Sequence, residues 1–550
     1  MYITEIPNRN SPPAVLLRES YREGGKVKTR TLANLTHLSP QRLAALKKAF
    51  KGEFDEAETV STSPPAIGEA FGGVFVLKQL SDQLGITKAL GKSEEAKQVL
   101  LLVLARICHQ GSRLSAVRWS KGQAIDDVLG LSDVNENELY AALDWVSKKQ
   151  KQIEHSLYKN YIRQHGKPPM LVLYDVTSSY FEGEKNELSA YGYNRDKKKG
   201  KKQIVIGLLA AEDGEPLCVR VFEGNTSDPK TLYEQIRTLK ENWNIKDVVL
   251  IGDKGMIKTP GKQAITQEGW HYITALSKPE IRKLLLNQRM QMSLFDEELY
   301  EIEMNGKRYV LRKNPIIRDR LRRERSKREA KLKKAVDARN EYVKAHQRAH
   351  PEKGLAKLQA LAKTYRIDGY IDLTLEDGQV QFKKSDQSME SQFSLDGCYM
   401  IESTVPTSMM STQDIEKCYR SLSQVEQDFR LIKTSSLEVR PIFLRKANRT
   451  KAHVFIAMLA LKLLRALRSK MNKVYGTTQE DRYAPTIKEA LEAMDTLRFL
   501  HYTVGDQLVT RLSKPNDNVR KILMALNIKL PKQKQRAKTN VGRRNARRKK

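Results

Sequence analysis

Three acidic residues have a type and a context that suit metal-ion chemistry. Asp175 follows the apolar run 170–174, and Asp253 follows the apolar run 248–251 and a glycine. Both runs are typical of buried strands, which we expect to be adjacent and parallel, so that the two carboxylates at their ends point into one crevice. Glu426 lies in a segment with helical periodicity and is the best candidate for a third carboxylate. Two-metal phosphoryl transfer on nucleic acid needs such a set, because the carboxylates bridge two ions about 3.5–4 Å apart.

Cations accompany the third carboxylate. Tyr419, Glu426 and Lys433 are spaced seven residues apart, which predicts one helical stripe, and Arg430 lies one turn beyond the glutamate. The stripe would offer a metal ligand flanked by phosphate-binding groups. Taken singly, an aspartate after an apolar strand is more often a turn or helix-cap residue. The residues by themselves therefore leave both a metal-dependent nuclease and a purely structural role open.

The elements around the two aspartates predict a particular sheet. After the strand that ends at Asp175 come a basic loop at 195–202 and a hairpin turning at Asp213-Gly214. A helix is predicted from Asp228, as N-cap, to about residue 244, followed by strands at 248–251 and 272–275. Three antiparallel strands, a crossover helix and a further strand predict an α/β fold, an RNase H-like mixed sheet with helices on both faces.

The rest of the chain contains an α+β insertion and basic ends. The insertion at 279–397 has strand pairs at Asn305-Gly306 and Asp377-Gly378 around a long charged helix, before a strand at 399–404 returns to the main sheet. Residues 318–334 of that helix carry ten basic and three acidic residues, which fits either a solvated arm or a helix laid along nucleic acid.

The N-terminal part is predicted to begin with a β-hairpin at 14–35. It turns at Gly24-Gly25 and has cations on one strand face, which suit either a phosphate backbone or a solvated edge strand: Lys26, Lys28 and Arg30. A linker at 61–65 precedes helices at 71–90 and 96–109, which suit a helix-turn-helix or an ordinary bundle. The tail at 531–550 has ten cations and no acidic residue, which predicts disorder and non-specific attachment to polyanions.

Composition narrows the class of partner. The 550 residues include 98 lysines and arginines against 65 acidic residues, a net charge of +33, so an anionic partner is expected and nucleic acid is favoured. Four scattered cysteines without a CxxC pair disfavour a zinc module and fit a reducing compartment. No apolar run approaches the ~18 residues of a membrane span, so we expect no membrane association and a cytoplasmic protein. Walker, GxSxG and HExxH motifs are lacking, which argues against ATP-driven, serine-hydrolase and zincin chemistry.

Several motifs together resemble one family. The segments are YDVTSSYFE around Asp175, FEGNTSD at 222–228, IGDKGM around Asp253 and YRSLSQVEQDFRLIK at 419–433. They are similar to the DDE transposases of bacterial insertion sequences, in the superfamily with the signature Y-x2-R-x3-E-x6-K. Arg440-Pro441 and AHVFIAMLALKLL from residue 452 add to the resemblance, and these motifs together extend over about residues 171–464. The N-terminal hairpin and NELYAALDW at 137–145 are also similar to this branch.

The resemblance implies roles for single residues. Asp175, Asp253 and Glu426 become the catalytic, metal-binding triad for two Mg²⁺ or Mn²⁺ ions. The candidate DNA contacts are Tyr419, Arg420, Arg430, Lys433, Lys254 and Asn225. The signature arginine is replaced by Leu422, and either Arg420 or Arg430 is expected to supply the missing cation. In related transposases the insertion lies between the second aspartate and the glutamate and helps to shape the DNA end.

The function implied is a transposase of an insertion sequence that acts on double-stranded DNA. It would bind the inverted-repeat ends, cut with water as nucleophile and join the 3′-hydroxyl ends to target DNA, as a homodimer at the bacterial nucleoid. A structure-specific nuclease and a non-catalytic DNA-binding protein remain alternatives. The predicted domains are a hairpin and helix (1–60), a helical DNA-end-binding region (61–168), a first catalytic part (169–278), the insertion (279–397), a second catalytic part with C-terminal helices (398–530) and a basic tail (531–550).

Overall fold

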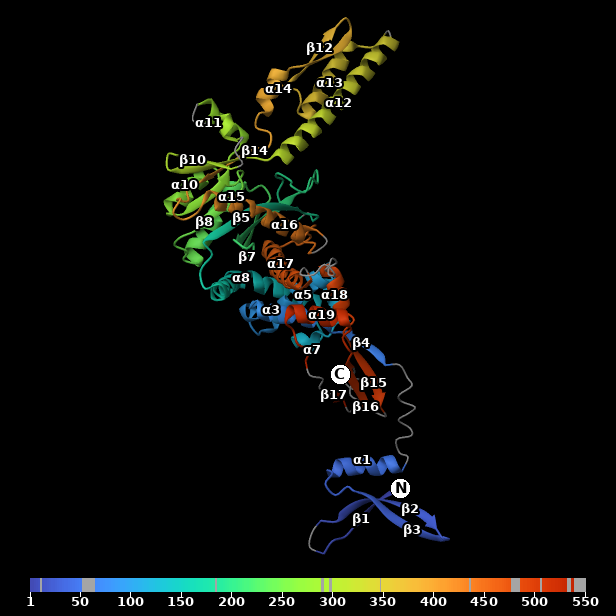
Figure 1. Ribbon diagram of the computed structural model, residues 1–550. Helices are drawn as coiled ribbons and strands as arrows, with labels where there is room; N and C mark the ends of the chain where they lie inside the picture. Colours follow the sequence, from blue (N-terminus) through green and yellow to red (C-terminus); the bar gives the residue numbers. More distant parts are fainter. Residues whose placement is uncertain are drawn as a thin grey trace. The chain divides into compact units, whose positions relative to one another are not determined.

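The computed structural model (Figure 1) describes residues 1–9, 12–51, 65–183, 185–287, 291–295, 299–346, 348–434, 437–475, 485–504, 507–531 and 536–538. The chain divides into two compact units, a larger one of residues 81–116 and 134–466 and a smaller one of residues 1–80, 117–133 and 467–550. These units group segments that are distant in sequence, and the six-part division in sequence order stays a prediction. Residues 61–64 of the predicted linker and most of the predicted tail lie outside the described residues.

A large mixed sheet dominates the larger unit. In its described part, eight strands have the order β10-β11-β14-β9-β8-β5-β6-β7. β5, β6 and β7 are antiparallel, whereas β8 is parallel to both β5 and β9. This agrees with the predicted three antiparallel strands followed by a further strand. The strands are β5 (Leu171–Tyr180), β6 (Gln203–Ala211), β7 (Pro216–Glu223), β8 (Val249–Gly252), β9 (His271–Ala275), β10 (Tyr300–Met304), β11 (Lys307–Lys313) and β14 (Cys398–Ser403).

The register of β5 corrects one prediction. β5 pairs with β8 from Leu171, opposite Val249, to Tyr174, opposite Gly252. Its pairing with β6 continues to Tyr180, so Asp175 lies in the middle of β5 and not at its end. The strand is longer than predicted because every residue of β6 is buried, and this apolar strand keeps the polar second half of β5 in the ladder.

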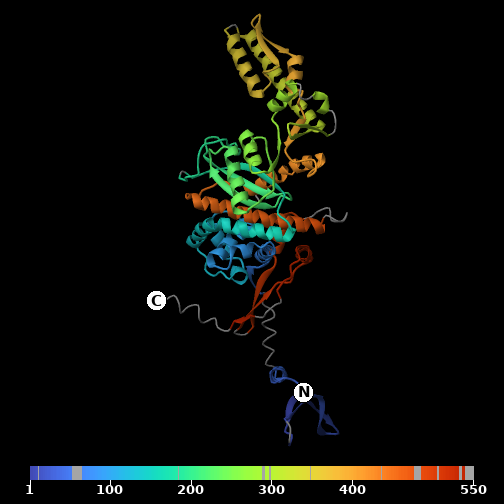
Figure 2. The same ribbon diagram turned by 90° about the vertical axis from the view of Figure 1, so that its left-hand side faces the viewer.

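Helices cover the sheet and fix its central strands. Tyr158 of α8 stacks on Trp243 with ring centroids 4.4 Å apart, in a core that also contains Val172 of β5 and Leu250 of β8. α8 and α17 lie side by side along the sheet (Figure 2), joined by Asp144 and Arg449. The helices with residues in this unit are α4 (Ile86–Leu90), α5 (Glu94–Cys108), α6 (Arg113–Ser120), α8 (Glu136–His165), α9 (Asp228–Arg237), the π-helix η1 (Thr238–Asn242), α10 (Thr259–Gln267), α11 (Lys278–Leu286), the 3-10 helix η2 (Met292–Phe295), α15 (Thr412–Arg420), α16 (Leu422–Lys433) and α17 (Ala447–Tyr475).

The start of the crossover helix differs from its prediction. Ser227, not Asp228, is the N-cap residue of α9, and Asp228 is the first helical residue. Its carboxylate is bound instead by Arg195, with both oxygens 2.7 Å from one guanidinium nitrogen. An ion pair with a guanidinium is stronger than a cap bond to a neutral amide, which explains the shift by one residue.

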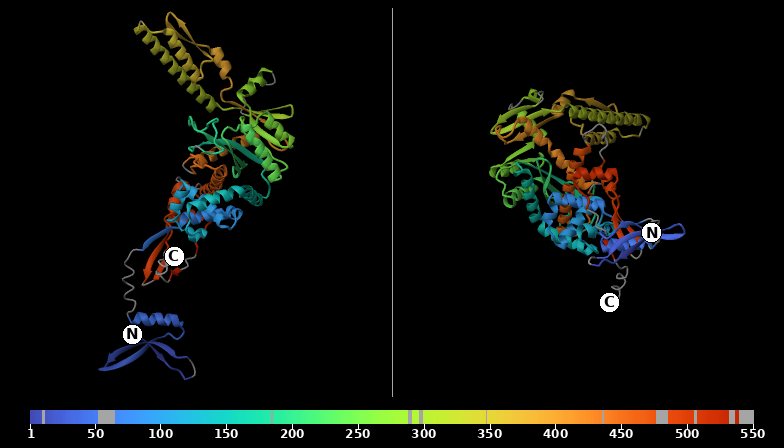
Figure 3. Two further views of the ribbon diagram at one scale, coloured as in Figure 1. Left: turned by 180° about the vertical axis from the view of Figure 1, so that it is seen from behind. Right: turned by 60° about the horizontal axis from the view of Figure 1, so that its bottom comes forward.

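The segment predicted as an insertion divides in two. β10 and β11 belong to the large sheet, because β11 pairs with β14. The segment after them builds its own core from Leu332, Val336, Leu358 and Tyr370, and its two long helices and strand pair are seen in Figure 3. Its elements are α12 (Pro315–Ala345), α13 (Pro351–Tyr365), β12 (Ile371–Glu376), β13 (Gln379–Lys384) and α14 (Asp386–Phe393).

The smaller unit contains two further sheets in its described residues, a three-stranded sheet β1-β2-β3 and a four-stranded sheet β17-β16-β15-β4. The predicted hairpin is confirmed as β2 and β3, with Lys28 paired to Glu23 and Arg30 to Glu19 across the strands, and β1 was not predicted. The elements are β1 (Tyr2–Ile6), β2 (Ala14–Glu23), β3 (Lys26–Asn34), α1 (Pro40–Phe50), β4 (Ala66–Ala70), α3 (Gly72–Gln83), α7 (Ile125–Leu129), α18 (Ile487–Met494), β15 (Arg498–Val504), β16 (Gln507–Leu512), α19 (Asp517–Leu526) and β17 (Arg536–Lys538). Within the described part of the chain, no helix has the length and apolarity needed to cross a bilayer.

Candidate active site

The structure brings the three predicted carboxylates together. β5 and β8 are parallel, and their pairing ends at Tyr174 opposite Gly252. The next residue is an aspartate in both segments, Asp175 within β5 and Asp253 directly after β8, so the two aspartates lie beside each other. α16, which carries Glu426, packs against β5. Burial, together with the negative charges of Asp253 and Glu426, raises the pKa of Asp175 to about 7, although the Val176 N–H and Arg195 act in the opposite direction. Asp253 and Glu426 themselves are exposed.

Tyr419 reaches the same place from a different helix than predicted. It lies in α15, and Ser421 separates this helix from α16, so the expected continuous stripe is interrupted. The side chain is nevertheless close to the carboxylates, since burial raises its pKa and the charges of Asp253, Glu426 and Asp175 add to the shift. α15 and α16 therefore both contribute side chains to the site, although they are not one continuous helix.

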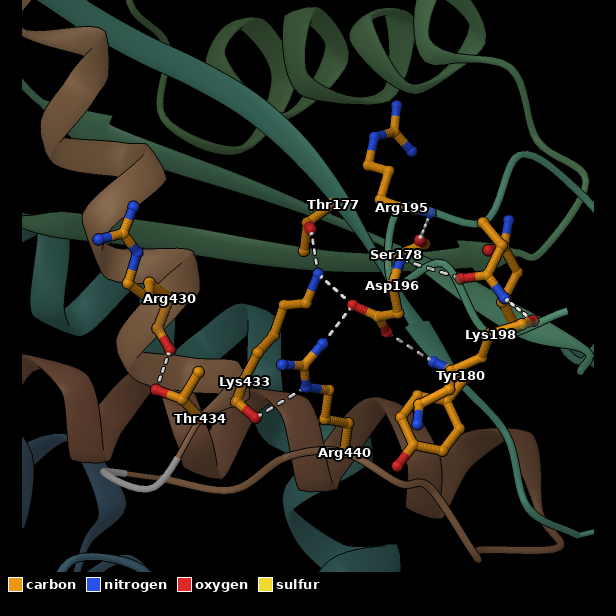
Figure 4. Close-up of polar contacts among 12 residues, drawn as sticks. Thr177, Ser178, Tyr180, Arg195, Asp196, Lys198, Arg430, Lys433, Thr434 and Arg440 are labelled. Atoms are coloured by element: carbon orange, nitrogen blue, oxygen red, sulfur yellow. Dashed lines mark hydrogen bonds and ion pairs between the residues drawn. The ribbon is translucent and has the colours of Figure 1, made fainter. Parts of the chain in front are cut away.

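Lys433 is held inside the protein by a polar network (Figure 4). Its ammonium nitrogen lies 2.8 Å from Oδ1 of Asp196 and donates a hydrogen bond of 2.8 Å to Oγ1 of Thr177. Arg440 binds the same Asp196 oxygen at 2.5 Å, and the side chain of Asp196 is only 1% exposed. Burial lowers the pKa of Lys433, and Asp196 acts in the opposite direction. Lys433 is thus fixed beside β5, two residues beyond Asp175 along the strand.

A second ion pair lies next to the carboxylates. Arg195 binds Asp228, as described above, and its backbone N–H donates to Oγ of Ser178 at 3.0 Å. A Cβ atom on Gly255 would lie 3.6 Å from Oδ2 of Asp253 and 3.8 Å from Oδ2 of Asp228. The two carboxylates therefore flank this glycine, and Arg195 neutralises the one at Asp228.

The other predicted DNA contacts occupy different settings. Arg420 is exposed but bound by Glu416 at 2.5 Å, whereas Arg430, Lys254 and Asn225 are exposed on α16, in the turn after β8 and in the loop before α9. Leu422, at the position of the signature arginine, is buried in the core. This position therefore contributes an apolar side chain to the core and no cation to the site.

The donor set suits a hard divalent cation, because it consists of carboxylate oxygens, and the charges of Asp253 and Glu426 raise the pKa of Asp175. Among the described residues, no group of three or more His, Cys, Asp or Glu side chains is close enough to hold an ion as it stands. The three carboxylates therefore lie in one region but do not form a complete coordination shell.

Sequence reasoning missed the residues that organise this site. Asp196 lies in a loop that was noted only for its cations, and its partners Lys433 and Arg440 are more than 230 positions away. No spacing rule connects such residues. The only sequence feature that pointed to this network was Asp196 itself, the single acidic residue within the basic run 195–202. An acidic residue in such a run is explained when it is a buried counter-ion for distant cations.

Comparison with known proteins identifies the family. Residues 166–463, more than half of the chain, match the family model described as transposase DDE domain. Residues 3–63 match the N-terminal domain of IS1634 family transposases. No protein among those with curated functions matches this chain.

Two solved structures are similar at a low level. One is the cryo-EM structure of the piggyBac transposase synaptic complex with hairpin DNA, with 12% identity, a TM-score of 0.35, and coverage of 73% of this chain and 70% of that chain. The other is the Mos1 transposase paired-end complex with left transposon end, with 12% identity, a TM-score of 0.15, and coverage of 33% and 58%. Scores this low carry no argument about this fold. The family match, over more than half of the chain, does: this protein belongs to the DDE transposases and is a DNA transposase of an insertion sequence.

Proposed function

We propose that Asp175, Asp253 and Glu426 form the catalytic triad of this transposase and hold two Mg²⁺ or Mn²⁺ ions. The family implies dependence on a divalent metal. The observation that carries the assignment is the register of β5 and β8, which ends one residue before an aspartate on each strand, with Glu426 contributed by the helix packed on β5. When bound, such ions would polarise a water nucleophile and stabilise the charge on the leaving oxygen.

The chain's own side chains would position the DNA strand. Tyr419 stands next to the carboxylates, and Arg430 is exposed one turn from Glu426. Lys433 is buried against Asp196, so it would bind a phosphate while remaining fixed by that carboxylate. Arg420, Lys254 and Asn225 complete the proposed contacts, and Arg430 is the better substitute for the signature arginine because Arg420 is already bound by Glu416.

The fold supports an RNase H-like reading of the catalytic core. β5, β6 and β7 are antiparallel, α9 crosses over, and β8 and β9 follow in parallel to β5. In this proposal the segment with its own core, α12 to α14, belongs to the insertion that shapes the DNA end. The protein would act as a homodimer that pairs two inverted-repeat ends, cuts them and joins the 3′-hydroxyls to target DNA in the bacterial cytoplasm, at the nucleoid.

The test is cleavage of a supercoiled plasmid that carries both element ends, in the presence of Mg²⁺. We expect cutting at the ends by the unaltered protein and none by Asp253→Asn or Glu426→Gln, while DNA binding persists in both. Glu492→Gln is the matched control, because this exposed glutamate lies on α18 in the smaller unit. Cutting without regard to the ends would favour a nuclease, and binding without any cutting would favour an architectural protein.

A further inference from the structure

One exposed surface next to the site combines aromatic rings with cations. It is the loop of residues 190–202, called here the aromatic-basic loop. Tyr191 is 66% exposed and Tyr193 is 82% exposed. The Lys202 ammonium lies 5.9 Å from the Tyr191 ring centre and the Arg195 guanidinium 5.6 Å from that of Tyr193. The loop also contains lysines 197, 198, 199 and 201.

The backbone that presents the rings is fixed. Ala190 and Gln203 exchange two backbone hydrogen bonds, of 3.2 and 3.0 Å. The buried side chain of Gln203 donates to the carbonyl oxygens of Tyr193 at 3.1 Å and Gly224 at 2.8 Å. A Cβ on Gly192 would lie 2.2 Å from the Gly224 oxygen, so only glycine allows this close packing between the two tyrosines. Exposed rings on a fixed backbone lose little conformational entropy on binding.

The same loop is attached to the elements that carry the proposed triad. Asp196 binds Lys433 at the end of α16 and accepts a hydrogen bond of 3.1 Å from the backbone of Tyr180 on β5. Arg195 donates through its backbone to Ser178 of β5. Figure 4 shows the contacts of Lys433, Arg440 and the Tyr180 backbone converging on Asp196, with the contact between Arg195 and Ser178 beside them. The loop is therefore held on the strand that contains Asp175 and on the helix that contains Glu426.

We propose that the aromatic-basic loop binds the element-end DNA strand next to the cleaved phosphate, with Tyr191 and Tyr193 stacked on unpaired bases. This inference rests on the proposed function of the triad. The exposed tyrosine rings can stack on the face of any unpaired base. The lysines of the loop supply positive charge that neutralises the phosphates of the strand. Fully paired DNA would leave the rings without a partner, since its base faces are already stacked.

The experiment compares binding to two duplexes of the element end without divalent metal, one fully paired and one with two unpaired bases beside the cleavage site. We expect the unaltered full-length protein to prefer the unpaired duplex, and Tyr191→Ala/Tyr193→Ala to weaken binding to it by about tenfold or more. Tyr191→Phe/Tyr193→Phe keeps both rings and should keep the preference. Tyr233→Ala, an exposed tyrosine on α9, is the matched control.

The outcomes separate this inference from the proposed function. Equal affinity of the unaltered protein for both duplexes, or an unchanged preference in the alanine variant, would overturn the stacking role even if cleavage at the ends is normal. A loss of affinity that is the same for paired duplex and for target DNA would replace it with a general DNA contact. Because binding is measured without metal, the result stands even if the triad variants show that the proposed chemistry is wrong.

Discussion

At the scale of single residues, Asp175 differs from the other two proposed ligands in its burial. It is enclosed by the sheet, whereas Asp253 and Glu426 are exposed, and their charges add to the effect of burial on its pKa. A carboxyl with a raised pKa holds its proton to a higher pH, so it is ready to exchange that proton for a cation. Its exchange should govern how metal binding depends on pH.

The first prediction concerns that dependence. With a pKa of about 7 for Asp175, a metal ion must displace a proton below pH 7 but not above it, so affinity should rise with pH up to about 7 and then level off. We expect the dissociation constant for Mn²⁺, measured by electron paramagnetic resonance, to increase about fivefold from pH 7 to pH 6, because half of the Asp175 carboxyls are already protonated at pH 7. Asp175→Asn should bind more weakly and lose this slope. A constant affinity between pH 6 and pH 8 would contradict the assignment.

The second prediction concerns Asp196. Asp196→Asn keeps the shape of the side chain but leaves Lys433 and Arg440 without their shared counter-charge. Removing one member of a buried ion pair costs about 3–5 kcal/mol, so we expect a lower midpoint of thermal unfolding and greatly reduced cleavage. Glu376→Gln breaks an exposed pair with Lys383 instead and should leave the midpoint of thermal unfolding nearly unchanged. Equal melting of the two variants would show that the network does not hold the site.

At the scale of elements, the sequence predicted correctly the strands whose formation depends mainly on their own residues. The apolar runs before Asp175 and Asp253 predicted two strands, and the parallel pairing of β5 with β8 confirmed that these strands are neighbours. The extension of β5 beyond Asp175 was not predictable from β5 alone, because it depends on pairing with β6. The break at Ser421 between α15 and α16 was hidden by a seven-residue spacing that continues across it.

Long-range ion pairs also decide how elements pack. Glu154 of α8 is 1% exposed and lies 2.8 Å from Arg220 of β7, with Gln150 donating a further hydrogen bond. Burial raises the pKa of Glu154 even though Arg220 opposes the shift. A buried acid of this kind is tolerated only with its partner, and neither residue had a sequence signal that linked it to the other.

The third prediction tests this pair. Arg220→Met leaves Glu154 buried and uncompensated, and should lower the free energy of unfolding by about 3–5 kcal/mol, seen as a lower urea midpoint. The double variant Glu154→Leu/Arg220→Met should recover most of the loss, because both charges are replaced by apolar groups of similar size. A double variant as unstable as the single one would mean that the pair contributes through shape and not charge.

At the scale of the whole molecule, the net charge of +33 favours binding to the phosphates of DNA. Its cations serve different purposes. Lys433, Arg440 and Arg220 are neutralised inside the fold, and Lys28 and Arg30 are paired across a surface hairpin. The segment 539–550, by contrast, has six lysines and arginines and no acidic residue to offset them. The count of 98 lysines and arginines therefore overstates how many cations are available to contact the DNA ends.

The last prediction follows from that difference. Deleting residues 539–550 removes charge without touching the proposed triad or its network, so the loss should fall equally on element-end DNA and on unrelated DNA. We expect weaker binding to both DNAs. The slope of the logarithm of affinity against the logarithm of salt concentration should become shallower by about 0.9 for each phosphate that the protein no longer neutralises. The ratio of the two affinities should stay the same, as measured by fluorescence anisotropy from low to moderate salt. Replacing the six cations by glutamine in the full-length chain should reproduce the effect, since charge and not length is its cause. A deletion that lowers affinity for the element ends alone would instead assign this segment to specific recognition, and the selectivity would then have to come from bases and not from phosphates.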